Sequence, residues 1–251
     1  MAVAPPAPLV ASRGARLLAV LALAPVLRLA VLRYAVPPGV ATRTGCDACG
    51  APIGLASPWP ALSPAARCGR CRTRVGPPPG TVELAVAAAL GVLVLIGTPA
   101  VVLAATAWWL GWAIPLVFVD AAVHRLPDRL TWPAAAGTWL LLGTAALAGA
   151  GSEPWLRATG AGIALALFFA TTTLLLGRRG FGLGDAKLAL GAGALLGWYG
   201  WVVPVAGLVI ALMLSGLVGI VLLITRRVGW RSDLPFGPFL ALATLATLLL
   251  I

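Results

Sequence analysis

Long apolar stretches, separated by short polar or glycine-rich connections, follow one another along most of the chain. Several are close to the ~20 residues that an α-helix needs to cross the hydrocarbon core of a bilayer. They do not alternate apolar and polar residues as barrel strands do, and an open sheet would leave backbone groups unpaired in lipid. We therefore predict an all-α, polytopic membrane protein of about eight transmembrane helices. The predicted helices lie at about 15–35, 82–97, 100–123, 130–150, 155–177, 186–199, 201–225 and 236–251.

The composition agrees with this prediction, because 61% of the residues are hydrophobic and only 10% are charged, which excludes a soluble domain. The formal net charge of +11 would by itself suggest a nucleic-acid partner. However, the basic residues gather in alternate connections between the predicted helices. They are Arg43, Arg67, Arg70, Arg72, Arg74, Arg125, Arg129, Arg178, Arg179, Lys187, Arg226, Arg227 and Arg231. Because basic loops stay cytoplasmic, these connections are predicted to lie inside and both termini outside, with the lipid bilayer and no nucleic acid as partner.

The first predicted helix departs from this pattern in two ways. Arg13 and Arg16 precede it and would lie outside, although the arginines of the following loop outnumber them. Arg28, within the helix, is expected to snorkel towards the cytoplasmic headgroups, with a contact to substrate or lipid as the alternative. Residues 13–24 imitate a signal peptide, but the apolar run continues to Val36, so we expect an uncleaved helix.

Two Cys-x-x-Cys motifs lie in the polar segment 37–80, at Cys46-Asp-Ala-Cys49 and Cys68-Gly-Arg-Cys71. Four thiolates at this spacing can surround a zinc ion tetrahedrally. Two disulfides are the alternative, but cytoplasmic thiols stay reduced. Because the segment has too few aliphatic residues to build a core, the zinc is expected to be structural and to supply the free energy of folding.

Asp120 and Asp185 differ from the other acidic residues because each adjoins an apolar run. A carboxylate there is costly unless it is paired or hydrated, which marks it as a candidate functional group. Taken singly, Asp120 could be an interfacial residue and Asp185 a helix N-cap. Taken together, they lie at the cytoplasmic ends of predicted helices. Two neighbouring carboxylates can share one proton and act on a peptide bond as general base and general acid, so we predict a proteolytic pair.

The residues next to Asp185 fit a site that a peptide backbone approaches. Gly182 and Gly184 lack Cβ atoms, and they are predicted to leave room for the substrate. Lys187 either tunes the carboxylate pair or only marks the cytoplasmic side.

Several other residues have simpler interpretations. His124 is expected to be a solvated interfacial residue, and Asp128 to cap the start of the fourth helix. Glu83 is an acidic residue of the kind favoured at a helix N-terminus. Gly193 and Gly197 form a small-x-x-x-small face and predict close helix packing.

These features divide the chain into four predicted parts. Residues 1–14 form a disordered tail, and residues 15–36 form the first transmembrane helix. Residues 37–80 form a cytoplasmic zinc-binding loop, and residues 81–251 form a transmembrane aspartic protease domain.

Four motifs occur together in the chain. Gly182 to Leu188 read Gly-x-Gly-Asp-x-Lys-Leu, and Asp120 precedes Pro127-Asp128 at a fixed spacing. The two cysteine motifs lie between the first and second helices, and Glu83-Leu84 opens the second helix. In this combination the sequence resembles the bacterial prepilin peptidases, the type IV leader peptidase family. A Gly-x-Gly-Asp motif alone also occurs in presenilin-like proteases, but these lack the cysteine loop.

The resemblance implies an aspartic endopeptidase of the bacterial inner membrane, with Asp120 and Asp185 as its catalytic pair. Its substrates would be type IV prepilins, or the pilin-like pseudopilins of secretion and competence machinery, cut after a glycine at the cytoplasmic face. Many relatives also methylate the new N-terminus with S-adenosylmethionine, a role tied to the cysteine loop. The usual Leu-Ser-Trp and Arg-Gly-Arg/Lys-Cys pieces of that loop appear here only as Leu62-Ser-Pro64 and Ala66-Arg67-Cys68. The resemblance therefore implies proteolysis and leaves methylation open.

Two other functions compete with proteolysis. A proton- or cation-coupled transporter would use Asp120 and Asp185 as coupling residues, but such proteins typically show duplicated halves and broken helices, which this chain does not show clearly. A zinc-loop membrane scaffold would require both aspartates to be dispensable.

Overall fold

The computed structural model describes residues 13–55, 61–177, 181–229 and 234–251. Its helices are α1 (Arg13–Tyr34), α2 (Thr81–Leu95), α3 (Ala100–Val123), α4 (Asp128–Ala145), the π-helical segment η1 (Ala146–Ala150), α5 (Ser152–Leu176), α6 (Leu183–Gly197), α7 (Val202–Ile224) and α8 (Gly237–Leu250). Within the described ranges no β-strand forms, and the loop between α1 and α2 holds two isolated bridges, Gly45–Pro52 and Arg67–Arg74. The predicted all-α fold is confirmed. Of the sequence features discussed above, the first twelve residues of the tail, Arg178, Arg179 and Arg231 lie outside the described residues.

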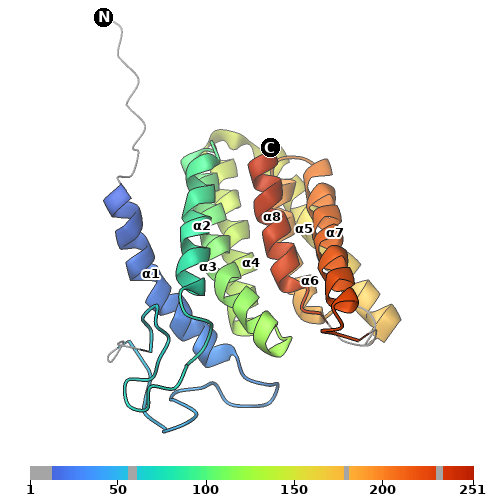
Figure 1. Ribbon diagram of the computed structural model, residues 1–251. Coiled ribbons are helices and arrows are strands. Elements are labelled where there is room, and N and C mark those ends of the chain that lie inside the picture. The colour runs from blue at the N-terminus through green and yellow to red at the C-terminus, as the bar shows by residue number, and fades with distance from the viewer. Residues whose placement is uncertain (1–12, 56–60, 178–180, 230–233) are drawn as a thin grey trace, which may run out of the picture.

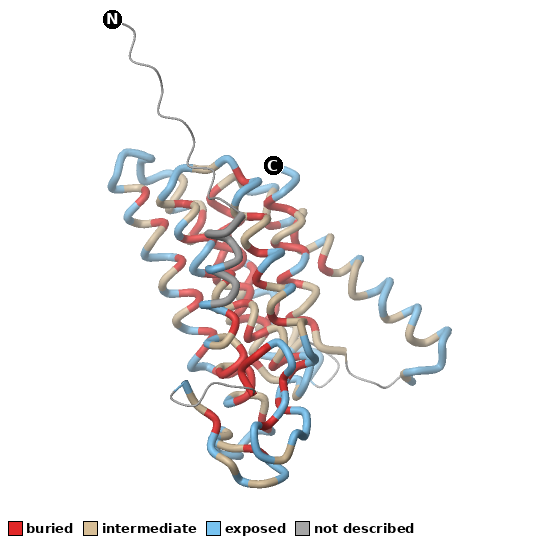
Figure 2. Tube along the Cα trace, turned by 60° about the vertical axis from the view of Figure 1, so that its left-hand side comes forward, coloured by how far each residue is buried: buried red, intermediate tan, exposed pale blue. Residues whose placement is uncertain are grey.

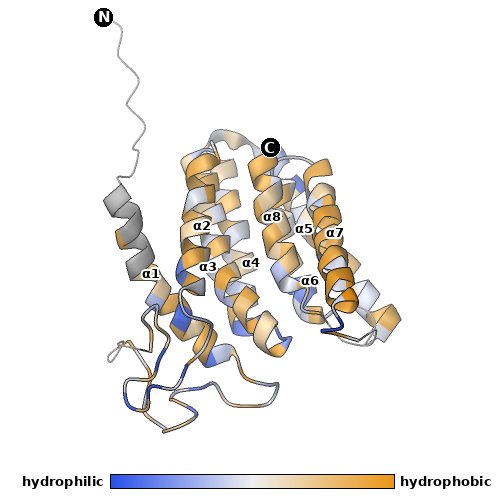
Figure 3. Ribbon diagram, in the orientation of Figure 1, coloured by the Kyte–Doolittle hydropathy of each residue, from blue (hydrophilic) through white to orange (hydrophobic). Residues whose placement is uncertain are grey.

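Helices α2 to α8 lie side by side in one bundle, and α1 runs along its edge (Figure 1). The loop between α1 and α2 lies at one end of the bundle, and the C-terminus lies at the other (Figure 1). Buried residues gather along the inside of the bundle (Figure 2). Apolar residues also cover much of its outside, whereas the polar residues concentrate towards the loop end (Figure 3). An apolar outer face suits contact with lipid rather than with water.

Four helical segments among the described residues are long and apolar enough to cross a membrane. They are α3, α4 continued by η1, α5 and α7, while α2 and α8 are shorter apolar helices. All eight predicted helices have a counterpart in the structure with boundaries shifted by a few residues. The membrane character of the fold is therefore supported, whereas the number of eight crossings stays a prediction.

Helix α6 is the most enclosed helix of the bundle, and eleven of its fifteen residues are buried. Its glycines allow neighbouring backbones to come close. A Cβ atom built at Gly193 would lie 3.0 Å from the Ala161 carbonyl oxygen of α5, and one at Gly197 would lie 2.4 Å from the Ala161 Cβ. The predicted close packing at Gly193 and Gly197 is confirmed, with α5 as the partner.

The prediction that Arg28 snorkels to the headgroups is wrong. Its side chain is only 1% exposed, and Nη2 lies 2.5 Å from Oε2 of Glu83 in an ion pair between α1 and α2. The guanidinium also reaches the carbonyl oxygens of Pro77 and Pro78, at 3.5 and 3.4 Å. Glu83 is thus the partner of a buried cation in addition to lying in the first turn of a helix. The local sequence gave no sign of this pairing, because the two residues are far apart in the chain.

We expect Glu83→Gln to destabilise the fold, because it leaves the Arg28 guanidinium buried without a counter-charge. Breaking a buried pair in this way costs about 3–5 kcal/mol of unfolding free energy. Thermal unfolding in detergent measures the effect. Glu153→Gln is the matched control, since Glu153 pairs with Arg157 at 2.7 Å but is 84% exposed. An exposed pair contributes about 0–1 kcal/mol, so equal loss of stability in both variants would contradict the structural role of the Arg28–Glu83 pair.

Candidate active site and metal centre

Asp120 lies in the last turn of α3 and is buried, with 5% of its surface exposed. Its Oδ2 atom accepts a hydrogen bond of 2.9 Å from the backbone N–H of Gly237, the first residue of α8. The amide groups of a first helical turn have no partner within their own helix and carry the positive end of the helix dipole. The N-terminus of α8 therefore supplies the polar contact of this carboxylate.

Asp185 lies in the first turn of α6 and is also buried, with 8% of its surface exposed. Its Oδ2 atom accepts a hydrogen bond of 2.9 Å from the backbone N–H of Gly182, which precedes the helix. This contact is half of a capping box, in which Gly182 is the N-cap and Asp185 is the third residue of the helix. The alternative interpretation of Asp185 as the N-cap itself is therefore not realised. The second oxygen, Oδ1, is buried and has no hydrogen-bond partner within the described structure. A buried carboxylate oxygen without a partner is costly and is available to a proton, a water or a substrate.

The structure brings Asp120 and Asp185 together. Their backbone donors, Gly237 and Gly182, directly follow Phe236 and Phe181, whose ring centres are 4.7 Å apart. The end of α3 and the start of α6 both lie at the loop end of the bundle (Figure 1). Both carboxylates are buried where the end of α3 and the starts of α6 and α8 come together. Such a pair has the chemical groups needed for general acid–base chemistry.

The two glycines predicted to leave room for a substrate beside Asp185 differ in their surroundings. A Cβ at Gly182 would meet only Oδ2 of Asp185 at 3.4 Å and the Gly184 nitrogen at 3.8 Å, which are ordinary contacts. A Cβ at Gly184 would lie 2.8 Å from the Cβ of Leu126. Gly184 is therefore needed for packing against the turn between α3 and α4, a role that the sequence did not indicate.

Lys187 forms an ion pair with Asp128, and its ammonium group lies 5.9 Å from the centre of the Trp132 ring. Asp128 is the first residue of α4, but no side-chain hydrogen bond caps that helix. The prediction that Asp128 is a helix cap is therefore wrong, because its carboxylate turns to Lys187 instead. His124, the residue that ends α3, is exposed, as expected.

The main residue that sequence reasoning missed is Gly237. Besides its hydrogen bond to Asp120, a Cβ at this position would lie 2.8 Å from Oδ2 of that carboxylate. The available signal was the run Pro235-Phe-Gly-Pro238 at the start of the last apolar stretch, in which proline occupies the first helical turn.

The four cysteines form a single cluster in the loop between α1 and α2. Their Sγ atoms all lie within 4.8 Å of one another, and the Cys46–Cys71 and Cys49–Cys68 distances are each 3.6 Å. All four are free thiols, so the disulfide alternative is not realised. Tetrahedral bonds of about 2.3 Å to a metal would place the sulfurs about 3.8 Å apart. The cluster is therefore able to hold a metal ion.

The two knuckles have the same backbone construction. The amide of the residue after the second cysteine donates to the carbonyl of the first cysteine, from Gly50 to Cys46 at 2.8 Å and from Arg72 to Cys68 at 3.1 Å. Both donors have positive φ angles, 69° at Gly50 and 60° at Arg72. This left-handed conformation is easy for glycine and unusual for arginine, which indicates that the turn shape is imposed by the site.

The donor chemistry of the cluster suits a cation. A hydrogen bond from the Thr73 hydroxyl lowers the pKa of the Cys46 thiol to about 6 and also lowers the pKa of Cys71. The Ala51 amide favours the Cys49 thiolate, but desolvation and the three neighbouring thiols together raise the pKa of Cys49 to about 11. Thiolates this close would repel one another, and a bound divalent cation would compensate that repulsion.

Comparison with known proteins shows the family of the chain. The model of the type IV leader peptidase family matches residues 104–224. The prepilin leader peptidase/N-methyltransferase of Burkholderia pseudomallei is 34% identical over 215 residues, covering 82% of this chain and 66% of that protein. The protein of the same name from Aeromonas salmonicida is 33% identical over 211 residues, covering 80% of this chain and 69% of that protein.

The chain belongs to the type IV leader peptidase family. A further relative with the same name, from Aeromonas hydrophila, is 34% identical over 215 residues, covering 80% of this chain and 69% of that protein. The chain spans slightly less than two-thirds of the length of the Burkholderia protein. No solved structure matches the chain significantly. Both aspartates lie inside the segment that matches the leader peptidase family, whereas the cysteine cluster and Gly237 lie outside it.

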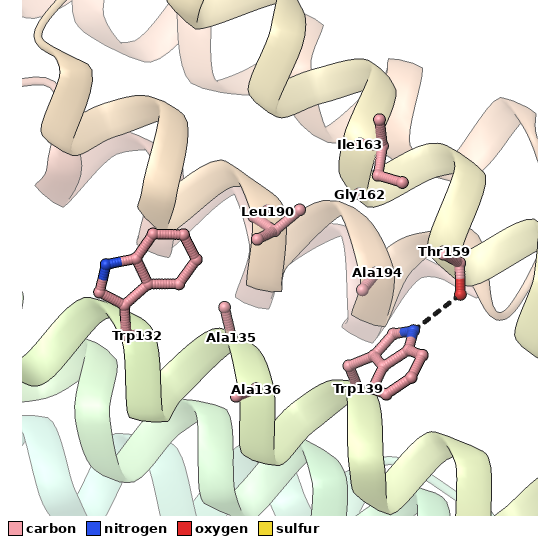
Figure 4. Close-up of a pocket in the computed structure, with 9 residues that line it drawn as sticks. All are labelled: Trp132, Ala135, Ala136, Trp139, Thr159, Gly162, Ile163, Leu190 and Ala194. Atoms are coloured by element: carbon pink, nitrogen blue, oxygen red, sulfur yellow. Dashed lines mark hydrogen bonds between the residues drawn. The ribbon is translucent and has the colours of Figure 1, made fainter. Parts of the chain in front are cut away.

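The chain also has an apolar cavity of about 290 Å³ between α4, α5 and α6. Its walls include Trp132 and Trp139 of α4 and Leu190 of α6, and Thr159 accepts a hydrogen bond of 2.8 Å from the Trp139 ring nitrogen (Figure 4). Neither aspartate lines this cavity. It is an apolar space whose lining does not include the two carboxylates.

We expect Gly184→Ala to lower stability, because the added Cβ overlaps the fixed Cβ of Leu126. Overpacking of this kind costs about 1–3 kcal/mol, which exceeds the gain of up to about 1 kcal/mol from alanine in a helix. Thermal unfolding of the detergent-solubilised protein measures the difference. Gly182→Ala is the control, since its Cβ meets only ordinary contacts. If Gly184→Ala were as stable as this control, the close approach to Leu126 would be incorrect.

Proposed function

We propose that the chain is a membrane aspartic endopeptidase that removes the leader of type IV prepilins or pilin-like precursors, with Asp120 and Asp185 as its catalytic residues. The observation that carries this proposal is the pair of buried carboxylates at one end of the bundle, within the segment matched by the leader peptidase family. The names of the relatives support the choice of substrate class.

The proposed reaction uses the two carboxylates in different protonation states. Two neighbouring carboxylates in a poorly solvated site do not both ionise easily, so they hold one proton between them. The ionised member takes a proton from a water, and that water attacks the scissile carbonyl carbon. The protonated member donates its hydrogen to the carbonyl oxygen and afterwards assists departure of the amine. The unpartnered Oδ1 atom of Asp185 is available for such a contact.

The surroundings of the pair suggest how a substrate reaches it. Among the described residues, a Cβ at Gly182 would meet only the Asp185 carboxylate and the Gly184 nitrogen, which favours the approach of a peptide backbone there. Gly184 packs against Leu126, and Lys187 is paired with Asp128. We therefore assign the substrate contact to Gly182 in preference to Gly184 and Lys187. The scissile bond would follow a glycine at the end of a basic leader, as the family resemblance implies.

We propose that the aspartates and the cysteine loop face the cytoplasm of a bacterium, in its inner membrane. The arginines of the loop and of the α3–α4 turn support this orientation, because basic connections remain on the cytoplasmic side. The division into the tail 1–14, the helix 15–36, the loop 37–80 and the protease domain 81–251 follows from the same topology. Eight membrane crossings are part of this proposal. The transporter alternative receives no support from the family assignment.

We propose zinc as the metal of the four-cysteine cluster, held by Cys46, Cys49, Cys68 and Cys71. The short sulfur–sulfur distances and the shared knuckle construction support a closed tetrahedral site. When bound, the ion would neutralise the thiolates and lock the two knuckles together. Its role would be structural, because all four ligand positions come from the protein.

Methylation of the new N-terminal amine with S-adenosylmethionine is a second candidate activity. Only the double name of the relatives favours it, and the loop departs from the usual pattern at Leu62-Ser-Pro64 and Ala66-Arg67-Cys68. Mass spectrometry of a candidate pilin N-terminus, from cells with and without this protein, reports the cut position and the methyl group together.

We expect Asp120→Asn and Asp185→Asn each to reduce cleavage of a co-expressed prepilin by at least about 100-fold, because each removes one general acid–base group. The two variants should still accumulate in the membrane. Cleavage is read from the mass of the pilin N-terminus. Glu153→Gln changes an exposed carboxylate in the first turn of α5, and this variant should cleave the prepilin as the wild type does. Wild-type cleavage by either asparagine variant would remove that aspartate from the mechanism.

We expect the purified protein to contain about one zinc ion per chain, as a single tetrahedral site of four thiolates requires. Cys46→Ser and Cys71→Ser should each abolish zinc binding and lower the thermal stability of the loop. Elemental analysis gives the metal content, and limited proteolysis of residues 37–80 gives the stability. Wild-type protein without zinc, or serine variants that retain it, would contradict the assignment.

A further inference from the structure

Three phenylalanine rings meet where α5, the start of α6 and the start of α8 converge. The ring centres are 4.8 Å apart for Phe169 and Phe181, 5.4 Å for Phe169 and Phe236, and 4.7 Å for Phe181 and Phe236. Two of the three pairs are edge-to-face, at 80° and 62° between ring planes, an arrangement that the charge distribution of aromatic rings favours. Phe169 is fully buried and Phe236 is 7% exposed. We call these three residues the aromatic cluster.

Two members of the aromatic cluster directly precede the groups that hold the aspartates. Phe181 is followed by Gly182, whose N–H donates to Asp185. Phe236 is followed by Gly237, whose N–H donates to Asp120. Each of these N–H groups belongs to the peptide unit that begins at the phenylalanine. A shift of either ring therefore moves a hydrogen-bond donor of one carboxylate.

Helix α5 contacts the cluster through a ring and a hydroxyl group. Phe169 contributes the third ring, and one turn later the Thr173 hydroxyl donates to the carbonyl oxygen of Phe181. The carbonyl oxygen of Phe236 in turn accepts the first helical hydrogen bonds of α8, from Phe239 at 3.0 Å and Leu240 at 3.1 Å. The Phe181 segment is thus held to α5 by the Thr173 hydrogen bond and the Phe169 ring, and the Phe236 segment by the Phe169 ring. Helix α5 carries neither aspartate.

We propose that the aromatic cluster is a positioning element that sets how the two carboxylates face each other, by holding the Gly182 and Gly237 N–H groups in fixed relation. The inference rests on the proposed proteolytic function and deepens it by naming residues that act through the aspartates. Proteolysis by a carboxylate pair needs both oxygens placed against one water and one carbonyl group. Side chains that fix two donors from separate helices meet that requirement without touching the substrate.

The test replaces the rings and separates catalysis from binding. Phe236→Leu keeps an apolar side chain but removes the ring contacts, and we expect kcat for a prepilin precursor in detergent to fall by about tenfold to 100-fold, since displacements on the order of 1 Å have such effects. KM should stay within about twofold, because the cluster does not touch the substrate. Phe181→Leu should behave likewise, and Phe181→Tyr, which keeps the ring at a partly exposed position, should recover most of the lost kcat.

Phe168→Leu is the matched control. Phe168 neighbours Phe169 on α5, with ring centres 5.3 Å apart, but it is 39% exposed and precedes no donor to either aspartate. Its kcat should equal that of the wild type. Thermal unfolding shows whether each variant is folded. If Phe236→Leu does not accumulate, Thr173→Val, which removes the hydroxyl that holds Phe181 and keeps the size of the side chain, should lower kcat with KM unchanged.

The outcomes separate this inference from the proposed function. If the wild type cleaves and the aspartate variants do not, while folded Phe236→Leu and Phe181→Leu retain full kcat, only the positioning role is overturned. An equal loss in Phe168→Leu, or a loss that appears in KM alone, would overturn it as well. If the wild type cleaves no prepilin precursor, the proposed function fails and the positioning role fails with it.

Discussion

The burial of two carboxylates at one end of a membrane bundle is the constraint on which the rest of this structure depends. A buried carboxylate costs several kcal/mol unless hydrogen bonds or a shared proton compensate it. Asp120 and Asp185 each receive one backbone N–H at 2.9 Å, from Gly237 and Gly182. Both donors lie at helix N-termini, where free amides and the helix dipole favour a negative charge. The end of α3 and the starts of α6 and α8 must therefore lie close together.

Helix α6 meets that requirement through the placement of its glycines. Gly184 and Gly191 are seven residues apart and therefore lie on one face of α6. Gly184 approaches Leu126, which follows α3, and Gly191 approaches the ring of Trp109 within α3. On another face, Gly193 and Gly197 approach Ala161 of α5. A Cβ at any of the four would lie between 2.4 and 3.0 Å from an atom of a neighbouring element. Glycines on two faces thus let α6 bring Asp185 against α3 while α5 supports it from the other side.

The sequence predicted the parts of this protein that local patterns determine. Apolar stretches located all eight helices, and the spacing of Cys46, Cys49, Cys68 and Cys71 predicted one cluster of sulfurs, as the structure has it. Long-range choices of partner were not predictable. Arg28 was expected at the headgroups but pairs with Glu83. Partner choice of this kind depends on which helices become neighbours, and a single sequence contains no periodic signal for that.

The cysteine loop contacts the helical bundle near both of its ends, and these contacts connect the four-cysteine cluster to the region of the two aspartates. Leu29 and Leu32 of α1 pack in one apolar cluster with Cys46 and Cys68. Near the end of the loop, the Arg28 guanidinium reaches the carbonyl oxygens of Pro77 and Pro78.

At the start of the loop, Arg125, five residues after Asp120, donates to the carbonyl oxygen of Pro37 at 3.3 Å. A loop held at these points has few independent positions relative to the bundle, because each attachment removes conformational freedom that the knuckles would otherwise keep. The shape of the cysteine loop and the position of the turn after Asp120 are therefore linked through the contact between Arg125 and Pro37.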